Sequence, residues 1–216
     1  MIKITGVAIE TIPSLSDLEK GIGKDWMEAW RAAHPRMKQE QTARKSLAGL
    51  FLLRLMGGEG ELIYEKGGRP YLANAAFDFS ISHTDSAVFC ALLNSQEKSF
   101  LRIGLDAEEG SRLADARLPG LAQRWFSDKE RARFCASPTK ETFLTLWTRK
   151  EALVKREGRG LSALGAADTV EAEKTLGVAF HSYRVGELLV TLCADADLAA
   201  PDGVEMLSLE KEEGKP

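Results

Sequence analysis

Four charged side chains are spaced so that they could do chemistry together. Glu151 and Lys155 lie four residues apart in a segment with helical periodicity, so they share one face of the helix, one turn apart. Asp106 and Glu108 flank Ala107 at the end of an apolar segment, so on a strand both carboxylates point to the same side. Three carboxylates and a lysine on two regular elements predict a metal-assisted site.

Carboxylate oxygens suit a hard cation such as Mg²⁺, which keeps part of its coordination for water or a substrate phosphate. Each motif also has a simpler interpretation. Glu151 and Lys155 alone could form a surface ion pair, and Asp106 and Glu108 alone could be the polar end of a strand. The metal hypothesis therefore depends on the fold bringing both motifs together.

A further candidate is His83, which follows Ser82 at the end of an expected strand. A hydroxyl beside an imidazole at a strand–turn junction suits phosphate binding, although a lone histidine is more often structural. His34 and His181 have no comparable neighbours, and we predict that both are structural.

Hydrophobic periodicity predicts the elements that must position these residues. Alternating or continuous apolar segments predict strands over residues 2–9, 77–82, 87–93, 100–106, 178–185, 188–193 and 204–209. Capping-box patterns begin at Ser16 and Ser127. Long helices are expected from Pro35 to Met56 and from Ser137 to about Lys155.

Helices followed by strands occur in this order twice, so we expect an α+β protein with two similar halves and antiparallel sheets. The division is predicted near residue 100, giving residues 1–100 and residues 101–216. The strand over residues 100–106 is expected to complete the antiparallel group of the first half. Because no flexible linker separates the halves, we expect a packed interface between them.

Composition excludes several classes of function. The net charge of −3 argues against a nucleic-acid binder, including a carboxylate–metal nuclease. Neither a run of eighteen apolar residues nor a signal-peptide pattern is present, so no membrane partner is expected. Cys90, Cys135 and Cys193 lie in apolar surroundings without CxxC spacing, which predicts buried thiols and a cytoplasmic location.

Basic residues are nevertheless concentrated in one N-terminal region, at Arg31, Arg36, Lys38, Arg44, Lys45 and Arg54. This region is either a solvated helix face or a surface where an anionic partner docks.

The candidate residues fall into motifs that follow one another in a fixed order. The motifs are Gly68-Arg69-Pro70, Ser82-His83, Asp106-Ala107-Glu108, and the block from Trp147 through Glu151 and Lys155 to Ser162. In order and spacing they closely resemble the motifs of the 4′-phosphopantetheinyl transferases. With the chain length of 216 residues, they are similar to the surfactin-synthetase type, in which one chain forms a pseudo-dimer.

The resemblance implies a pseudo-twofold fold with the active site in the cleft between its halves. It implies a holo-[acyl-carrier-protein] synthase reaction, in which the phosphopantetheine arm of coenzyme A is transferred to a serine of an acyl or peptidyl carrier protein. Adenosine 3′,5′-bisphosphate is the other product. The implied protein is a cytoplasmic monomer whose partners are coenzyme A and an apo-carrier.

The resemblance also implies a role for each candidate residue. Asp106, Glu108 and Glu151 would hold Mg²⁺, or Mn²⁺, and Glu151 would also be the preferred general base. Lys155 would stabilise charge on the phosphate or the leaving group. The residues implied to contact coenzyme A are Arg44, Arg69, Ser82, His83 and Lys155.

Two departures from the family pattern are visible. Ala107 replaces a larger aliphatic residue on the side away from the carboxylates, and Arg69 replaces a more common lysine. Lys150 belongs to the motif but receives no definite role. The alternative function is a non-catalytic module that binds coenzyme A or a carrier, and retention of the carboxylates and Lys155 argues against it.

Overall fold

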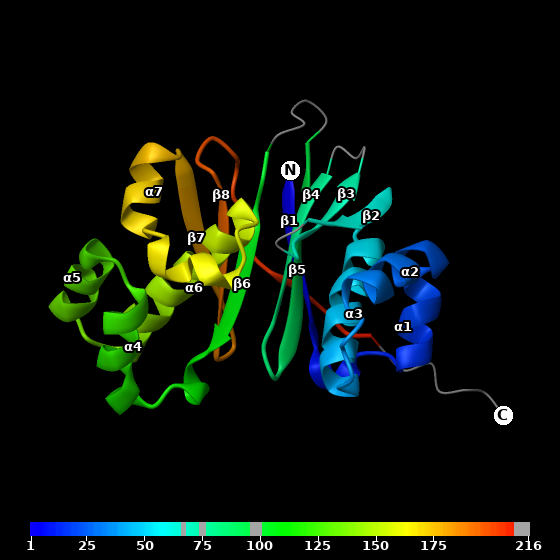
Figure 1. Ribbon diagram of the computed structural model, residues 1–216, viewed down its shortest axis with the longest axis horizontal. Coiled ribbons are helices and arrows are strands. Elements are labelled where there is room, and N and C mark those ends of the chain that lie inside the picture. The colour runs from blue at the N-terminus through cyan, green and yellow to red at the C-terminus, as the bar shows by residue number, and fades with distance from the viewer. Residues whose placement is uncertain (66–67, 74–76, 96–100, 210–216) are drawn as a thin grey trace.

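The computed structural model describes residues 1–65, 68–73, 77–95 and 101–209. Helices α1, α2 and α3 lie at one end, α4, α5 and α7 lie at the other, and the strands lie between them (Figure 1). The first part of the chain forms β1 (Ile2–Ala8), α1 (Leu15–Ile22), α2 (Lys24–Ala33), α3 (Glu40–Leu55), β2 (Glu61–Tyr64), β3 (Pro70–Ala73), β4 (Phe77–His83) and β5 (Ala87–Asn94). The second forms β6 (Gly104–Glu109), α4 (Leu118–Trp125), α5 (Asp128–Ala136), α6 (Lys140–Glu157), α7 (Thr169–Thr175), β7 (Val178–Val185), β8 (Leu188–Asp195) and β9 (Glu205–Leu207).

Two larger sheets and a hairpin organise the strands. The first sheet has the order β4-β5-β1-β9, the second has the order β6-β8-β7, and β2 pairs with β3. These pairings are antiparallel, except that β9 runs parallel to β1. The predicted α+β class with antiparallel sheets is therefore confirmed. The division at residue 100 stays a prediction, since β9 crosses back to the first sheet.

A single apolar layer fills the space between the two sheets. Ile4 and Phe89 of the first sheet pack in one cluster with Leu105 and Val190 of the second, and all four are buried. On its other face the first sheet packs against buried residues of α3, such as Leu47 and Leu50. The two sheets are thus joined by an apolar core, which fixes β4 relative to β6.

The strand expected over residues 100–106 differs from its prediction. The strand begins at Gly104 and pairs with β8, so the prediction that it completes the first sheet is wrong. The amide groups of Ile103, Leu105 and Ala107 donate instead to side chains of β4, which keeps the backbones of the two strands apart. Phe100, the predicted first residue, lies outside the described residues.

Helix starts were predicted less well than helix ends. Pro35 lies in a turn and α3 begins at Glu40, while α1 is capped by Ser14 rather than Ser16. Ser14 is the cap because its hydroxyl accepts a hydrogen bond from the amide of Asp17, a donor of the first turn that has no partner within the helix. The capping box at Ser127 is confirmed.

Two of the three cysteines match the prediction. Cys90 and Cys193 are buried, whereas Cys135 is exposed near the end of α5, so its predicted burial is wrong. Its helix packs mainly through Phe134, the preceding residue, which leaves Cys135 on the outer face. Among the described residues, no helix combines the length and apolar character needed to cross a membrane.

Candidate active site

A cavity of about 410 Å³ opens where β4, β6 and the last turns of α6 meet. Its lining includes the predicted site residues Arg69, Ser82, His83, Asp106, Glu108, Glu151 and Lys155. Arg44 does not line it. The two motifs that the sequence placed on a strand and a helix therefore share one cavity.

Close approach of β6 and α6 brings their acidic residues together. A Cβ atom built on Gly104 would lie only 1.9 Å from the carbonyl oxygen of Ala152, so only glycine permits this spacing. Asp106 is almost completely buried, and Ala107 faces the core, as the alternation predicted. On α6, Glu151 immediately precedes Ala152 and Lys155 lies three residues after it, and both line the cavity.

Lys155 connects both sheets to α6. Its Nζ donates to the Oγ of Ser82 over 2.9 Å and to the Oδ1 of Asp106 over 2.7 Å. Ser82 also donates to that Oδ1 over 3.1 Å. The second carboxylate oxygen of Asp106, Oδ2, is buried and has no hydrogen-bond partner while its neighbours are ionised, whereas a protonated Glu151 carboxyl hydrogen-bonds with Asp106. A buried, unpaired anionic oxygen is costly unless a cation or donor reaches it, so this atom is available to a ligand.

The carboxyl of Glu151 is a weaker acid than a glutamate in water. Desolvation, together with the negative charge of Asp106, raises the pKa of its carboxyl to about 8, and nearby Lys155 opposes the shift. At neutral pH the carboxyl therefore keeps its proton until a positive charge arrives. A bound cation would favour the ionised form.

Glu108 is oriented by an indole. The Nε1 of Trp147 donates to its Oε1 over 3.2 Å. Trp147 is itself held by Phe143, with ring centroids 6.1 Å apart, and by Trp125, at 6.5 Å. The aromatic cluster of the second half therefore reaches the candidate site through one hydrogen bond.

Magnesium was predicted on Asp106, Glu108 and Glu151. Their oxygen atoms are ligands that this ion prefers, and the unpartnered Oδ2 of Asp106 fits such a role. As they stand, however, the described residues include no set of three His, Cys, Asp or Glu side chains close enough to hold an ion. All three carboxylates nevertheless line the same cavity.

His83 lies at the end of β4 and is exposed to the cavity. Partial desolvation lowers the pKa of its imidazole, and the positive charges of Lys155 and Lys45 lower it further. A neutral imidazole can still donate one hydrogen bond to a phosphate oxygen. The other histidines differ: His34 stacks on Trp30, with centroids 5.2 Å apart, and His181 lies on β7.

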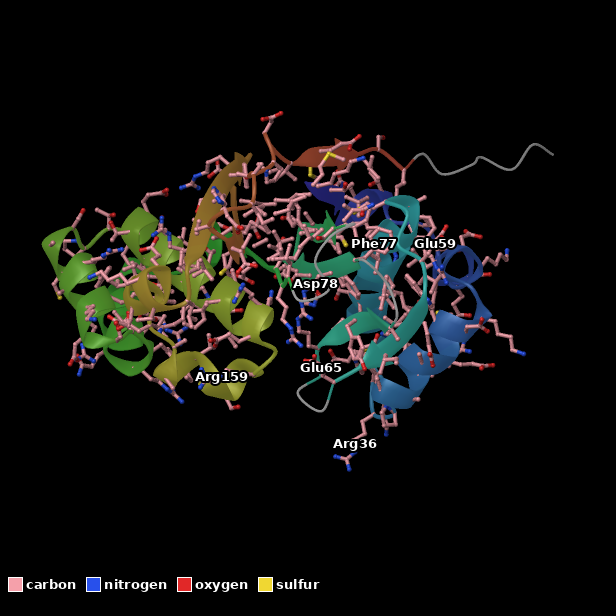
Figure 2. All side chains as sticks on the ribbon, turned by 90° about the horizontal axis from the view of Figure 1, so that it is seen from above. Arg36, Glu59, Glu65, Phe77, Asp78 and Arg159 are labelled. Carbon is pink, nitrogen blue, oxygen red and sulfur yellow. The ribbon has the colours of Figure 1, made fainter. Side chains whose placement is uncertain are left out.

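The predicted basic region is largely engaged with the fold. Arg44 donates to the carbonyls of Ile12 and Pro13 and so anchors the chain before α1. In the same region ion pairs join Arg31 to Glu19 and Lys45 to Asp85, and Arg54 lies over the ring of Trp26. Arg36 and Lys38 are exposed, and Arg36 projects from the surface in Figure 2. The hypothesis of an anion-docking surface therefore applies mainly to these two.

Sequence reasoning gave Lys150 no role, and the structure supplies one. Lys150 is fully buried and its Nζ lies 2.8 Å from the Oε2 of Glu130, which is also fully buried. Lys150 donates in addition to the carbonyl of Ala167, and Thr169 donates to the Oε1 of Glu130. The pair therefore ties α5 and α6 to the segment that begins α7. The capping box had identified Glu130, but nothing local indicated its partner.

Two sheets that meet at a cavity with clustered carboxylates, a lysine and a histidine define a protein suited to a phosphorylated substrate. Residues 102–190 match the family model of the 4′-phosphopantetheinyl transferase superfamily. A relative, 4′-phosphopantetheinyl transferase psf-1 of Bacillus pumilus, is 29% identical over 203 residues, covering 83% of each chain. Both comparisons confirm the resemblance to this superfamily that the motifs predicted.

Proposed function

We propose that this protein transfers the 4′-phosphopantetheine arm of coenzyme A to a serine of an acyl or peptidyl carrier protein. The products are the holo-carrier and adenosine 3′,5′-bisphosphate, as in the holo-[acyl-carrier-protein] synthase reaction. The observation that carries the proposal is the cluster of Ser82, Asp106 and Lys155, whose hydrogen bonds join both sheets to α6 beside the cavity.

The reaction makes modest covalent demands on the protein. The serine oxygen of the carrier bonds to the phosphorus that bears the pantetheine arm, and the bond from that phosphorus to the bisphosphate oxygen breaks. Phosphoryl transfer of this kind depends on positioning and charge neutralisation. The serine proton passes to a carboxylate, directly or through water. Glu151 is our preferred acceptor because it lines the cavity and because a bound cation, by favouring its ionised form, leaves it able to accept a proton.

Asp106, Glu108 and Glu151 would hold Mg²⁺, or Mn²⁺ in its place. When bound, the ion would neutralise charge on the pyrophosphate of coenzyme A. Lys155 would add its positive charge, and Ser82 and His83 would donate hydrogen bonds to phosphate oxygens. The resemblance also implies coenzyme A contacts for Arg44 and Arg69, but both guanidinium groups already bind acceptors within the protein, so neither is part of this proposal.

We also propose a cytoplasmic monomer whose two halves, residues 1–100 and residues 101–216, flank the cleft. One chain would then supply a complete site. Exposed Arg36 and Lys38 offer a positive surface that would steer acidic carriers.

The test is incubation with coenzyme A, Mg²⁺ and a panel of apo-carriers, followed by intact-mass spectrometry. A mass gain of one phosphopantetheine on the carrier is expected, and its loss with EDTA should be reversed by Mg²⁺. Asp106→Ala should lower the rate about a hundredfold to a thousandfold, the usual effect of losing one electrostatic contact in a site. Near-normal transfer by this variant would contradict the proposed site. Saturable binding of coenzyme A without any mass gain would favour the non-catalytic module.

A further inference from the structure

The seam between β4 and β6 is closed by side chains rather than by backbone pairing. Alternate residues of β4 point across it and accept hydrogen bonds from alternate amide groups of the facing chain. The three bonds are Ile103 N to Asp78 Oδ2 at 2.7 Å, Leu105 N to Ser80 Oγ at 2.8 Å, and Ala107 N to Ser82 Oγ at 3.1 Å. The register between the two sheets near the cavity is therefore set by these three side chains.

Arg69 closes one end of this seam. Its Nη2 lies 2.9 Å and 2.7 Å from the two carboxylate oxygens of Asp78, and it also donates to the carbonyl of Ile103 over 3.2 Å. The side chains of Arg69 and Asp78 are only 8% and 10% exposed. Asp78 lies near the middle of the molecule, between the helices of the two ends (Figure 2). A pair so enclosed is screened little by solvent.

The same guanidinium holds the end of α6. Its Nε donates over 3.0 Å to the backbone carbonyl of Lys155, in the last turn, where carbonyl groups lack regular intrahelical partners. Arg69 therefore hydrogen-bonds to the backbone of Lys155, the same residue whose ammonium donates to Ser82 and Asp106. At the other end of the seam, the Oγ of Ser82 accepts a hydrogen bond from the Lys155 ammonium. Both contacts of Lys155 thus depend on the alignment of β4 with α6.

We propose that Arg69 and Asp78 are positioning residues, which fix the last turn of α6 against β4 so that the Lys155 ammonium stays aimed at the cavity. Arg69 then acts through the protein rather than by gripping a phosphate of coenzyme A. This inference rests on the proposed function of the site. Asp78 is essential to it, because its carboxylate holds the guanidinium in place and also binds the amide of Ile103.

The kinetic test compares Arg69→Gln, Asp78→Asn and the double variant in the carrier assay with Mg²⁺. We expect kcat to fall about tenfold to a hundredfold in each single variant, the scale of a small misplacement of a reacting group. The KM for coenzyme A should change less than about twofold, and the double variant should be no worse than the poorer single variant, because both changes break one interaction. Arg69→Lys, which keeps the charge, should recover part of kcat.

The matched control is Arg102→Gln. It removes a guanidinium from a nearby but more exposed ion pair, with Glu65 at 2.9 Å, and should leave kcat and KM close to the original values. A raised KM for coenzyme A in Arg69→Gln, with unchanged KM in Asp78→Asn, would overturn the proposal in favour of a phosphate contact. If the unchanged protein modifies no carrier, the proposed function fails, and this comparison is replaced by the following measurement.

A second readout needs no transfer. Acetylation of Lys155 by acetic anhydride, followed by peptide mass spectrometry, reports how firmly its ammonium is held. In Asp78→Asn and Arg69→Gln we expect the modification rate at Lys155 to rise severalfold relative to Lys20, an exposed lysine in the same sample. An unchanged ratio in both variants would contradict the positioning role, whether or not the protein proves to be a transferase.

Discussion

Two lysines of helix α6, Lys150 and Lys155, each pair with a buried carboxylate, and the two pairs have different surroundings. The Nζ–O distances are nearly equal, 2.8 Å for Lys150 with Glu130 and 2.7 Å for Lys155 with Asp106. Both side chains of the first pair are fully buried, whereas Lys155 is 28% exposed and borders the cavity. Five residues of helix turn the second lysine roughly 140° from the first, so the pairs serve opposite sides.

The difference lies in the atoms that surround each pair. Both oxygens of Glu130 accept further hydrogen bonds, from Ser127 and Thr169, so the first pair is complete without any ligand. Asp106 keeps one buried oxygen that has no partner other than the protonated carboxyl of Glu151. A complete buried pair fixes the arrangement of helices, whereas an incomplete one at a cavity is available to bind. The same residue types therefore give structure in one place and a candidate site in the other.

The most severe way to test this contrast is to break the complete pair. Lys150→Met leaves the charge of Glu130 buried and uncompensated, which we expect to lower the free energy of unfolding by about 3–5 kcal/mol. Urea denaturation followed by circular dichroism measures the loss.

Lys155→Met is the control on the same helix. Because Lys155 is partly exposed, its change should cost much less stability while transfer activity falls strongly. Equal losses of stability in the two variants would show that the pairs do not differ in the way proposed. Replacing Glu130 as well should not restore Lys150→Met fully, since the amides of Ser127 and Thr169 would lose their acceptor.

Features that depend on neighbouring residues, such as turns, helix caps and the faces of helices and strands, could be predicted from local patterns in the sequence. The hairpin of β7 and β8 turns at Gly186, whose φ of 56° favours glycine, and the Ser127 capping box starts α5. Helical and strand periodicity also placed Glu151 with Lys155, and Asp106 with Glu108, on faces that do meet at one cavity. These predictions needed no knowledge of distant contacts.

Partners far apart in the chain could not be predicted in this way. Glu130 forms an ion pair with Lys150, twenty residues later in the chain, and Arg69 donates a hydrogen bond to the carbonyl of Lys155 across the seam. For Arg69, the motif suggested a phosphate contact, because a motif shows residue type and spacing but not which acceptors surround a guanidinium. The sheet that β6 joins was missed for a related reason, since side chains of β4 occupy its free amide groups.

The stability of the protein should depend on pH through Glu151, the neighbour of the incomplete pair. The pKa of the Glu151 carboxyl is raised from 4.5 to about 8, so the folded state binds its proton more tightly than the unfolded state does. The stabilisation is complete at pH values below about 4.5 and is lost as the pH rises to about 8. We therefore expect the free energy of unfolding in EDTA to contain a component that falls across this window.

Chemical denaturation at several pH values, compared with Glu151→Gln, isolates that component. The variant cannot ionise at this position, so its stability should fall less steeply with pH. Adding Mg²⁺ should reverse the trend in the unchanged protein, because a cation favours the ionised carboxylate and its binding releases the proton. A pH profile identical in the two proteins would contradict the proposed coupling of Glu151 to the incomplete pair.

The smallest expected effect concerns the hydrogen bond from Trp147 to Glu108. Trp147→Phe keeps an aromatic ring beside Phe143 but removes the Nε1 donor, so stability should fall by only about 1 kcal/mol. Without that bond Glu108 is less well oriented, and we expect the Mg²⁺ concentration for half-maximal transfer to rise about tenfold, as for other residues that orient metal ligands. Trp125→Phe changes the neighbouring indole in the same aromatic cluster and should leave that concentration almost unchanged. If both variants raised the Mg²⁺ concentration for half-maximal transfer equally, the packing of the aromatic cluster, rather than the hydrogen bond to Glu108, would determine how well the site binds Mg²⁺.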